Sequence, residues 1–143
     1  MKEILFEMLK YYGLREVFGP AAEPEIIKMF KDIGYNWVQS DETAWCSALM
    51  NFVCKKLSYE RSGKLDARSW LKMSIVVLKP QLGDIVVFWR NSPTSWEGHV
   101  GLYISDRNNL IYTLGGNQEN MVSIAGYPKS RILGFRQVHK IVD

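Results

Sequence analysis

Apolar residues recur at three- and four-residue steps through the first 57 positions of the chain. This spacing places apolar side chains along one side of a helix. It predicts an amphipathic helix over 2–12, a second over 24–33 that begins at Pro24, and a third over 43–57. Residues 35–42 are polar and connect the second helix to the third. The first part of the chain should therefore form a helical layer.

The pattern changes in the second half of the chain. A short helix is expected after Asp66, which would be its N-cap. Short apolar runs between turn residues then predict strands over 85–89, 99–104, 110–114, 121–124 and 132–136. The first run is continuously apolar, which predicts a strand buried on both faces. Helices followed by antiparallel strands predict the α+β class, and 143 residues fit a single domain over 1–143.

Composition and charge exclude several classes of protein. Hydrophobic residues make up 47% and charged residues 23%, which is typical of a globular protein. The net charge of +3 is too small to indicate a nucleic-acid partner. No apolar stretch reaches the roughly 18 residues of a membrane span, and the N-terminus lacks the pattern of a signal peptide. We expect a monomer made in the cytoplasm, with no insertion into a membrane.

The chain has two cysteines, Cys46 and Cys54, both in the third predicted helix. Eight helical residues separate their Cα atoms by roughly 12 Å, which is too far for a disulfide. With Asp41 or Thr43 as N-cap, Cys46 falls near the helix start, whose partial positive charge stabilises a thiolate. A thiolate is the nucleophile that acyl transfer needs. The alternative is a small buried residue, which is what we expect of Cys54.

The two histidines differ in setting. His139 lies near the C-terminus and is expected at the surface. His99 begins a predicted strand, and strand alternation places it on the same face as Gly101, which leaves room beside the ring. His99 is therefore the candidate general base.

A third polar residue follows from hairpin pairing. If the strands flanking the turn at 106–109 pair, His99 faces the region that ends at Asn117. An amide oxygen there would accept the imidazole N–H and orient the ring. Gln118 should point to the opposite face, and it is the second candidate for this role or a donor to the oxyanion. Asn117 could instead be an ordinary turn residue after two glycines.

Metal and cofactor sites are not indicated. Two cysteines and one well-placed histidine do not make a tetrahedral zinc set. No Asp-rich calcium loop, phosphate-binding glycine loop or dinucleotide fingerprint is present in the sequence. We expect no metal and no cofactor.

Four sequence blocks occur in a fixed order: Asp41-Glu42-Thr43-Ala44-Trp45-Cys46-Ser47-Ala48, Gly83-Asp84-Ile85-Val86-Val87-Phe88, Gly98-His99-Val100-Gly101 and Leu114-Gly115-Gly116-Asn117-Gln118. Together they resemble the CHAP and NlpC/P60 superfamily of papain-like cysteine amidases. More closely, they are similar to a compact group of single-domain phage and prophage proteins. The segments 19–26 and 127–131 also fit this group, so the resemblance spans nearly the whole chain.

The resemblance implies N-terminal helices packed on an antiparallel sheet, with a triad that carries onto Cys46, His99 and Asn117. Many relatives have an acidic residue near the third position, where this chain has two glycines. Relatives hydrolyse peptidoglycan at the N-acetylmuramoyl-L-alanine amide or within the stem peptide, and phage members are endolysins. The implied function is therefore an endolysin-like peptidoglycan hydrolase that acts on the wall after release or delivery.

In this hypothesis the Cys46 thiolate attacks an amide carbonyl, His99 transfers the proton, and Asn117 orients His99. Trp45, Trp96 and Gln118 are candidates for substrate contact. Two alternatives remain. One is a toxin-type amidase delivered into rival bacteria, and the other is a non-catalytic wall-binding domain on the same fold.

Overall fold

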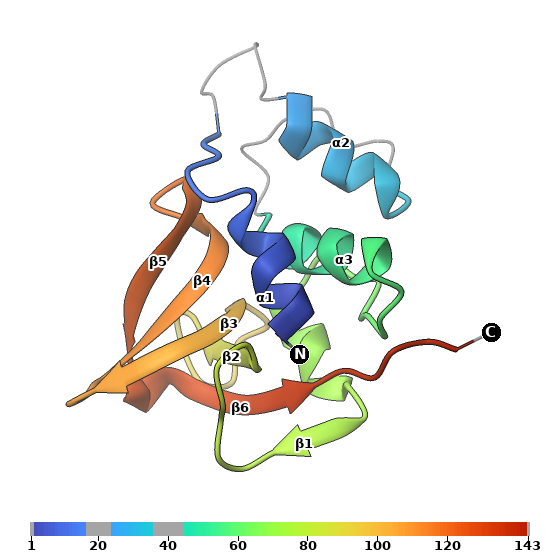
Figure 1. The fold of residues 1–143 in the computed structure, drawn as a ribbon. Helices are drawn as coiled ribbons and strands as arrows, with labels where there is room; N and C mark the ends of the chain where they lie inside the picture. Colours follow the sequence, from blue (N-terminus) through green and yellow to red (C-terminus); the bar gives the residue numbers. More distant parts are fainter. Residues whose placement is uncertain (1, 17–23, 36–44, 143) are drawn as a thin grey trace.

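The computed structural model describes residues 2–16, 24–35 and 45–142 of the 143-residue chain. Within these ranges, three α-helices lie together on one side of a sheet (Figure 1). Their bounds are α1 Lys2–Leu9, α2 Pro24–Asp32 and α3 Cys46–Lys56. α1 and α3 pack against the sheet through buried apolar faces, and α2 packs on α3. The three predicted helices are therefore present in the predicted order.

The sheet has six strands in the order β1-β6-β2-β3-β4-β5, and each neighbouring pair is antiparallel. The bounds are β1 Ile75–Val77, β2 Ile85–Trp89, β3 Gly98–Arg107, β4 Leu110–Gln118, β5 Met121–Pro128 and β6 Ile132–Gln137. The five predicted strands are all present, and β3, β4 and β5 extend well beyond their predicted ends. β1 was not predicted, because a three-residue run shows no readable alternation. The predicted α+β class is confirmed.

The apolar run of β2 is buried on both faces, as predicted. Ile85 and Val87 face the helices and join the main core. Val86 and Phe88 face the other side, where they form a smaller core with Ile111. A strand with apolar neighbours on both sides has no polar face, which explains its continuous pattern.

Two helix ends differ from prediction. α1 ends at Leu9 rather than residue 12, and the following turn closes at Gly13, where φ is 88°. Glycine adopts this left-handed backbone without steric cost. α3 begins at Cys46, and its N-cap is Trp45, which makes no side-chain capping hydrogen bond. The N-caps predicted at 41 and 43 lie outside the described residues.

Two short 3₁₀ helices complete the structure, η1 Ala67–Lys72 and η2 Lys129–Arg131. η1 is the predicted helix after Asp66, although the Asp66 side chain makes no cap hydrogen bond. Its attachment is different: Trp70 Nε1 donates to Ser47 Oγ at 2.8 Å, and Ser47 Oγ donates to the carbonyl of Lys64 at 2.6 Å. These hydrogen bonds tie η1 to the first turn of α3.

β4 contains a bulge near its end. Gly115 pairs with Ser123, but the next pair joins Gln118 to Met121, so β4 carries one residue more than β5 over this interval. Asn117 lies in the bulge with φ of 59°, a left-handed conformation that asparagine tolerates better than most residues. The extra residue shifts the alternation of side chains, so Gln118 takes the face that Asn117 would have occupied.

None of the helices in the described ranges is long and apolar enough to cross a membrane.

Gly116 provides a test of the packing between β4 and α3. A Cβ at this position would lie 2.7 Å from two ring carbons of Trp45 and 3.0 Å from Leu49 Cδ2. Trp45 is fully buried and has no room to move. We expect Gly116→Ala to lower the free energy of unfolding by about 1–3 kcal/mol in urea titrations.

The matched control is Gly126→Ala on β5, where the nearest atom is Tyr112 Cε1 at 3.1 Å. Because Tyr112 is only partly buried, it has room to adjust, and the loss should be smaller. Equal losses for the two variants would contradict this account of the Trp45 packing.

Candidate active site

Cys46 is the first residue of α3 and lies at a small cleft. The cleft has a volume of about 100 Å³, and its other walls include Asp66, Arg90, Trp96 and Glu97. Cys46 itself is 6% exposed, so the sulfur reaches the cleft from within the core. Any molecule that enters the cleft meets this sulfur among charged and aromatic side chains.

Burial raises the pKa of the Cys46 thiol above its usual value. A hydrogen bond from the backbone N–H of Val100 and the positive charge of Arg90 lower this pKa. The N–H groups of Ser47 and Cys46 at the helix start act in the same direction. The helix start therefore favours the thiolate, as predicted, but burial outweighs it. The resting sulfur is therefore a neutral thiol at neutral pH, and not the thiolate that the helix start alone would favour.

His99 is the second residue of β3 and lies directly across from Phe88 of β2. It is fully buried. The next residue, Val100, donates its backbone N–H to the sulfur of Cys46, so the thiol lies against the β3 backbone beside His99. Burial lowers the pKa of His99 to about 4, with a smaller lowering from the charge of Arg90 and an opposing effect of its hydrogen bond to Gln118. The imidazole is therefore neutral at neutral pH.

The hydrogen bonds of Gln118 determine which imidazole nitrogen carries the proton. The amide nitrogen of Gln118 donates to the carbonyls of Ser123 at 2.7 Å and Thr113 at 3.2 Å. Because carbonyls only accept, this fixes the amide orientation. Gln118 Oε1 therefore accepts from His99 Nε2–H at 2.9 Å, and also from Thr113 Oγ1 at 2.9 Å.

The other imidazole nitrogen, Nδ1, is left without a proton. Nδ1 of His99 is buried and has no hydrogen-bond partner among the described residues. Burial of an acceptor without a partner costs folding free energy, so such an atom in a folded protein calls for an explanation. His99 Nδ1 is therefore a neutral acceptor that no described side chain occupies.

The structure corrects the prediction for the third position. Gln118, not Asn117, makes the hydrogen bond to His99. The bulge at Asn117 is the physical reason, because it reverses the side-chain alternation that the prediction assumed. Gly115 contributes as well: a Cβ there would lie 2.9 Å from Gln118 Oε1. One of the two glycines in this block therefore makes room for the glutamine side chain.

The candidates for substrate contact have different positions. Trp96 is 75% exposed and lines the cleft, where it is free to contact a bound molecule. Trp45 is fully buried beneath the site, and Gln118 is 2% exposed with its polar atoms already paired. Neither Trp45 nor Gln118 lines the cleft, so contact of these two side chains with a substrate stays a prediction.

Tyr127 of β5 was not predicted as a site residue, although it belongs to a segment that contributes to the family resemblance. Its ring stacks on the His99 ring, with centroids 4.8 Å apart and planes 24° apart. The Tyr127 ring also stacks on the Phe88 ring, with centroids 4.8 Å apart. No spacing rule points to this residue, because β5 reaches His99 only through the curvature of the sheet.

The remaining cysteine and histidine, Cys54 and His139, do not line the cleft. Cys54 is free and fully buried, and burial raises its pKa to about 12. His139 lies at the surface, as predicted, with Nδ1 3.2 Å from the Glu60 carboxylate. Within 2–16, 24–35 and 45–142, no group of three or more His, Cys, Asp or Glu side chains is placed to hold a metal ion.

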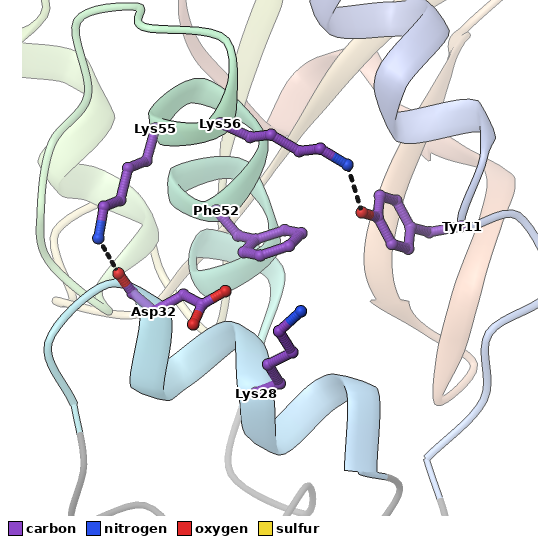
Figure 2. Close-up of a pocket in the computed structure, with 6 residues that line it drawn as sticks. All are labelled: Tyr11, Lys28, Asp32, Phe52, Lys55 and Lys56. Atoms are coloured by element: carbon purple, nitrogen blue, oxygen red, sulfur yellow. Dashed lines mark hydrogen bonds between the residues drawn. The ribbon is translucent and has the colours of Figure 1, made fainter.

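A second hollow, with a volume of about 350 Å³, does not include Cys46 in its lining. Figure 2 shows the side chains around it. It is lined by Tyr11, Lys28, Asp32, Phe52, Lys55 and Lys56. Lys55 donates to the backbone carbonyl of Asp32, and Lys56 lies 3.0 Å from the Glu7 carboxylate. This hollow is lined by neither a thiol nor an imidazole, so the Cys46 cleft is the candidate site for a cysteine nucleophile.

Comparisons with known proteins bear on the fold. No protein-family model matches the chain, and no curated protein matches it. Among solved structures, it is similar to a Staphylococcus aureus protein described as similar to a lipoprotein of the NLP/P60 family. The TM-score is 0.50 at 20% identity, and the match covers 95% of this chain but 40% of that one. This chain therefore spans less than half the length of that protein, and the two share the NlpC/P60 fold.

The buried His99 predicts a pH dependence of stability. Its pKa is about 4 in the folded protein, against the usual 6.5 of a histidine. Between these values the unfolded chain binds a proton that the folded chain excludes, so stability falls as the pH falls through this range. Above pH 6.5 the contribution is complete, and below pH 4 this group causes no further loss.

From pH 7.5 to pH 5, we expect His99 to account for a loss of about 2 kcal/mol in the free energy of unfolding. The measurement is urea unfolding of the native protein and of His99→Gln at both pH values. The variant should lack this part of the loss. Parallel pH dependences of the two proteins would show that His99 is not buried as a neutral ring.

Proposed function

We propose that this protein is a cysteine hydrolase that cleaves an amide bond of bacterial peptidoglycan. The observation that carries the proposal is the buried His99 Nδ1, which has no partner among the described residues and belongs to the residue before Val100, whose backbone N–H meets the Cys46 sulfur. Gln118 holds the proton on Nε2 and leaves Nδ1 as the base. A nucleophile, a base and an amide that orients the base are the parts of a thiol hydrolase.

In the proposed reaction, His99 Nδ1 takes the proton from Cys46 Sγ as the sulfur attacks the amide carbonyl. General-base assistance is needed because the resting thiol is protonated. The backbone N–H groups at the start of α3 stabilise the oxyanion. His99 then protonates the leaving amine, and a thioester to Cys46 remains. Water, activated by His99, hydrolyses the thioester and restores both groups.

The choice of peptidoglycan rests on the motif resemblance and on the shared fold. The four sequence blocks include both Cys46 and His99, and the backbone N–H of Val100, the residue after His99, meets the Cys46 sulfur. The exposed Trp96 at the cleft provides a flat apolar surface of the kind that packs on sugars and peptides. An endolysin-like role is the finer proposal, and the toxin-type amidase uses the same chemistry on the same substrate class.

The two cysteines allow a direct test. We expect Cys46→Ala to abolish lysis of purified cell walls, since no other thiol in the described chain reaches the cleft. Cys54→Ala is the matched control, because it removes a buried thiol from the same helix and should retain lysis. Circular dichroism would establish that both variants fold. Mass spectrometry of the released fragments identifies the bond that is cut.

Persistent lysis by folded Cys46→Ala would overturn the proposal. Binding of cell walls without lysis by the native protein would favour the non-catalytic wall-binding domain instead.

The neighbouring amides of Gln118 and Asn117 provide a second test. Gln118→Ala removes the acceptor that fixes the imidazole, and we expect kcat for wall hydrolysis to fall by about 10²-fold or more. Asn117→Gly keeps the left-handed backbone and removes only the side chain, so activity should stay within a few-fold of native. The reverse ranking of the two variants would restore Asn117 as the orienting residue.

A further inference from the structure

We propose that Tyr127 is a positioning residue that holds both the His99 ring and Arg90 in place around the Cys46 thiol. This inference rests on the proposed function of the same site. It assigns two separate roles to one side chain: the ring supports the imidazole, and the hydroxyl supports the guanidinium.

The ring contact fixes what the hydrogen bond to Gln118 leaves open. One hydrogen bond at Nε2 sets a direction for the imidazole but allows the ring to rotate about that direction. The Tyr127 ring lies nearly parallel to the imidazole, with planes 24° apart and centroids 4.8 Å apart, so it defines the plane. With both constraints present, Nδ1 has one orientation.

Tyr127 is itself held firmly. On β5 it pairs with Ile111 of β4, and its ring stacks against Phe88 with planes 26° apart. Phe88 lies directly across from His99 in the sheet. The three rings therefore pack against one another, with the Phe88 and His99 centroids 6.4 Å apart, and loss of the Tyr127 ring would admit water to the imidazole.

The Tyr127 hydroxyl interacts with Arg90, which lines the cleft. Burial raises its pKa to about 12, so the hydroxyl stays neutral at physiological pH. The charge of Arg90 and a hydrogen bond with its side chain lower this pKa, so the hydroxyl is a partner of the guanidinium. Arg90 also lines the cleft, and its charge favours the Cys46 thiolate. The hydroxyl therefore holds a cation where negative charge forms.

Two substitutions separate the roles. Tyr127→Phe keeps the ring and removes the hydroxyl, whereas Tyr127→Leu removes both. Tyr112→Leu, on neighbouring β4, is the matched control for the loss of a tyrosine outside the site. Tyr127→Met provides a second variant without the ring, in case the leucine variant does not fold.

The experiment combines NMR titration of the two histidines with the rate of Cys46 alkylation by iodoacetamide. Neither measurement requires a cell-wall substrate. In Tyr127→Leu or Tyr127→Met, the pKa of His99 should rise from about 4 by about one unit or more, as water reaches the ring. In Tyr127→Phe this shift should be less than about half as large, while Cys46 alkylation at fixed pH slows by about threefold. Tyr112→Leu should match the native protein in both measurements.

An unchanged His99 pKa in the folded leucine or methionine variant would overturn the role of the ring. Native alkylation in Tyr127→Phe would overturn the role of the hydroxyl. Absence of wall lysis by the native protein would contradict the proposed function but leave these two measurements intact. Where lysis is present, a positioning role predicts a lower kcat with little change in KM for all three Tyr127 variants.

Discussion

The hydrogen bond from His99 Nε2–H to Gln118 Oε1 is the contact on which the rest of the site depends. It is buried, and its direction is set by the carbonyls that hold the Gln118 amide nitrogen. This bond keeps the proton on Nε2 and leaves Nδ1 as a buried acceptor without a partner among the described residues. The bulge in β4, the glycine beside the amide and the ring of Tyr127 all support the same arrangement.

Burial sets the electrostatic state of the site. It raises the pKa of the Cys46 thiol and lowers that of His99 to about 4, so both groups are neutral at rest. A neutral pair suits a mechanism in which the proton moves as the sulfur attacks. Arg90 favours the thiolate but disfavours the imidazolium, which makes its position in the cleft important for the balance between the two.

Periodic patterns in the sequence predicted the elements that form the scaffold, because helices and strands with one apolar face leave a regular signal. They also identified Cys46 and His99, which occur in distinct motif blocks. The sequence pattern favoured Asn117 over Gln118 as the partner of His99, because strand alternation assumes unbroken pairing. One bulged residue reverses the alternation and places Gln118 there instead. Tyr127 was missed because its contact with His99 depends on sheet curvature, which leaves no trace in spacing.

The most direct test of this arrangement is the tautomer of His99, measured by long-range ¹H–¹⁵N NMR at neutral pH. Only two histidines contribute signals, and exposed His139 serves as the internal reference. We expect a neutral His99 imidazole with the proton on Nε2 and the ¹⁵N shift of an unprotonated Nδ1. A proton on Nδ1, or a fully protonated imidazolium at neutral pH, would contradict this expectation.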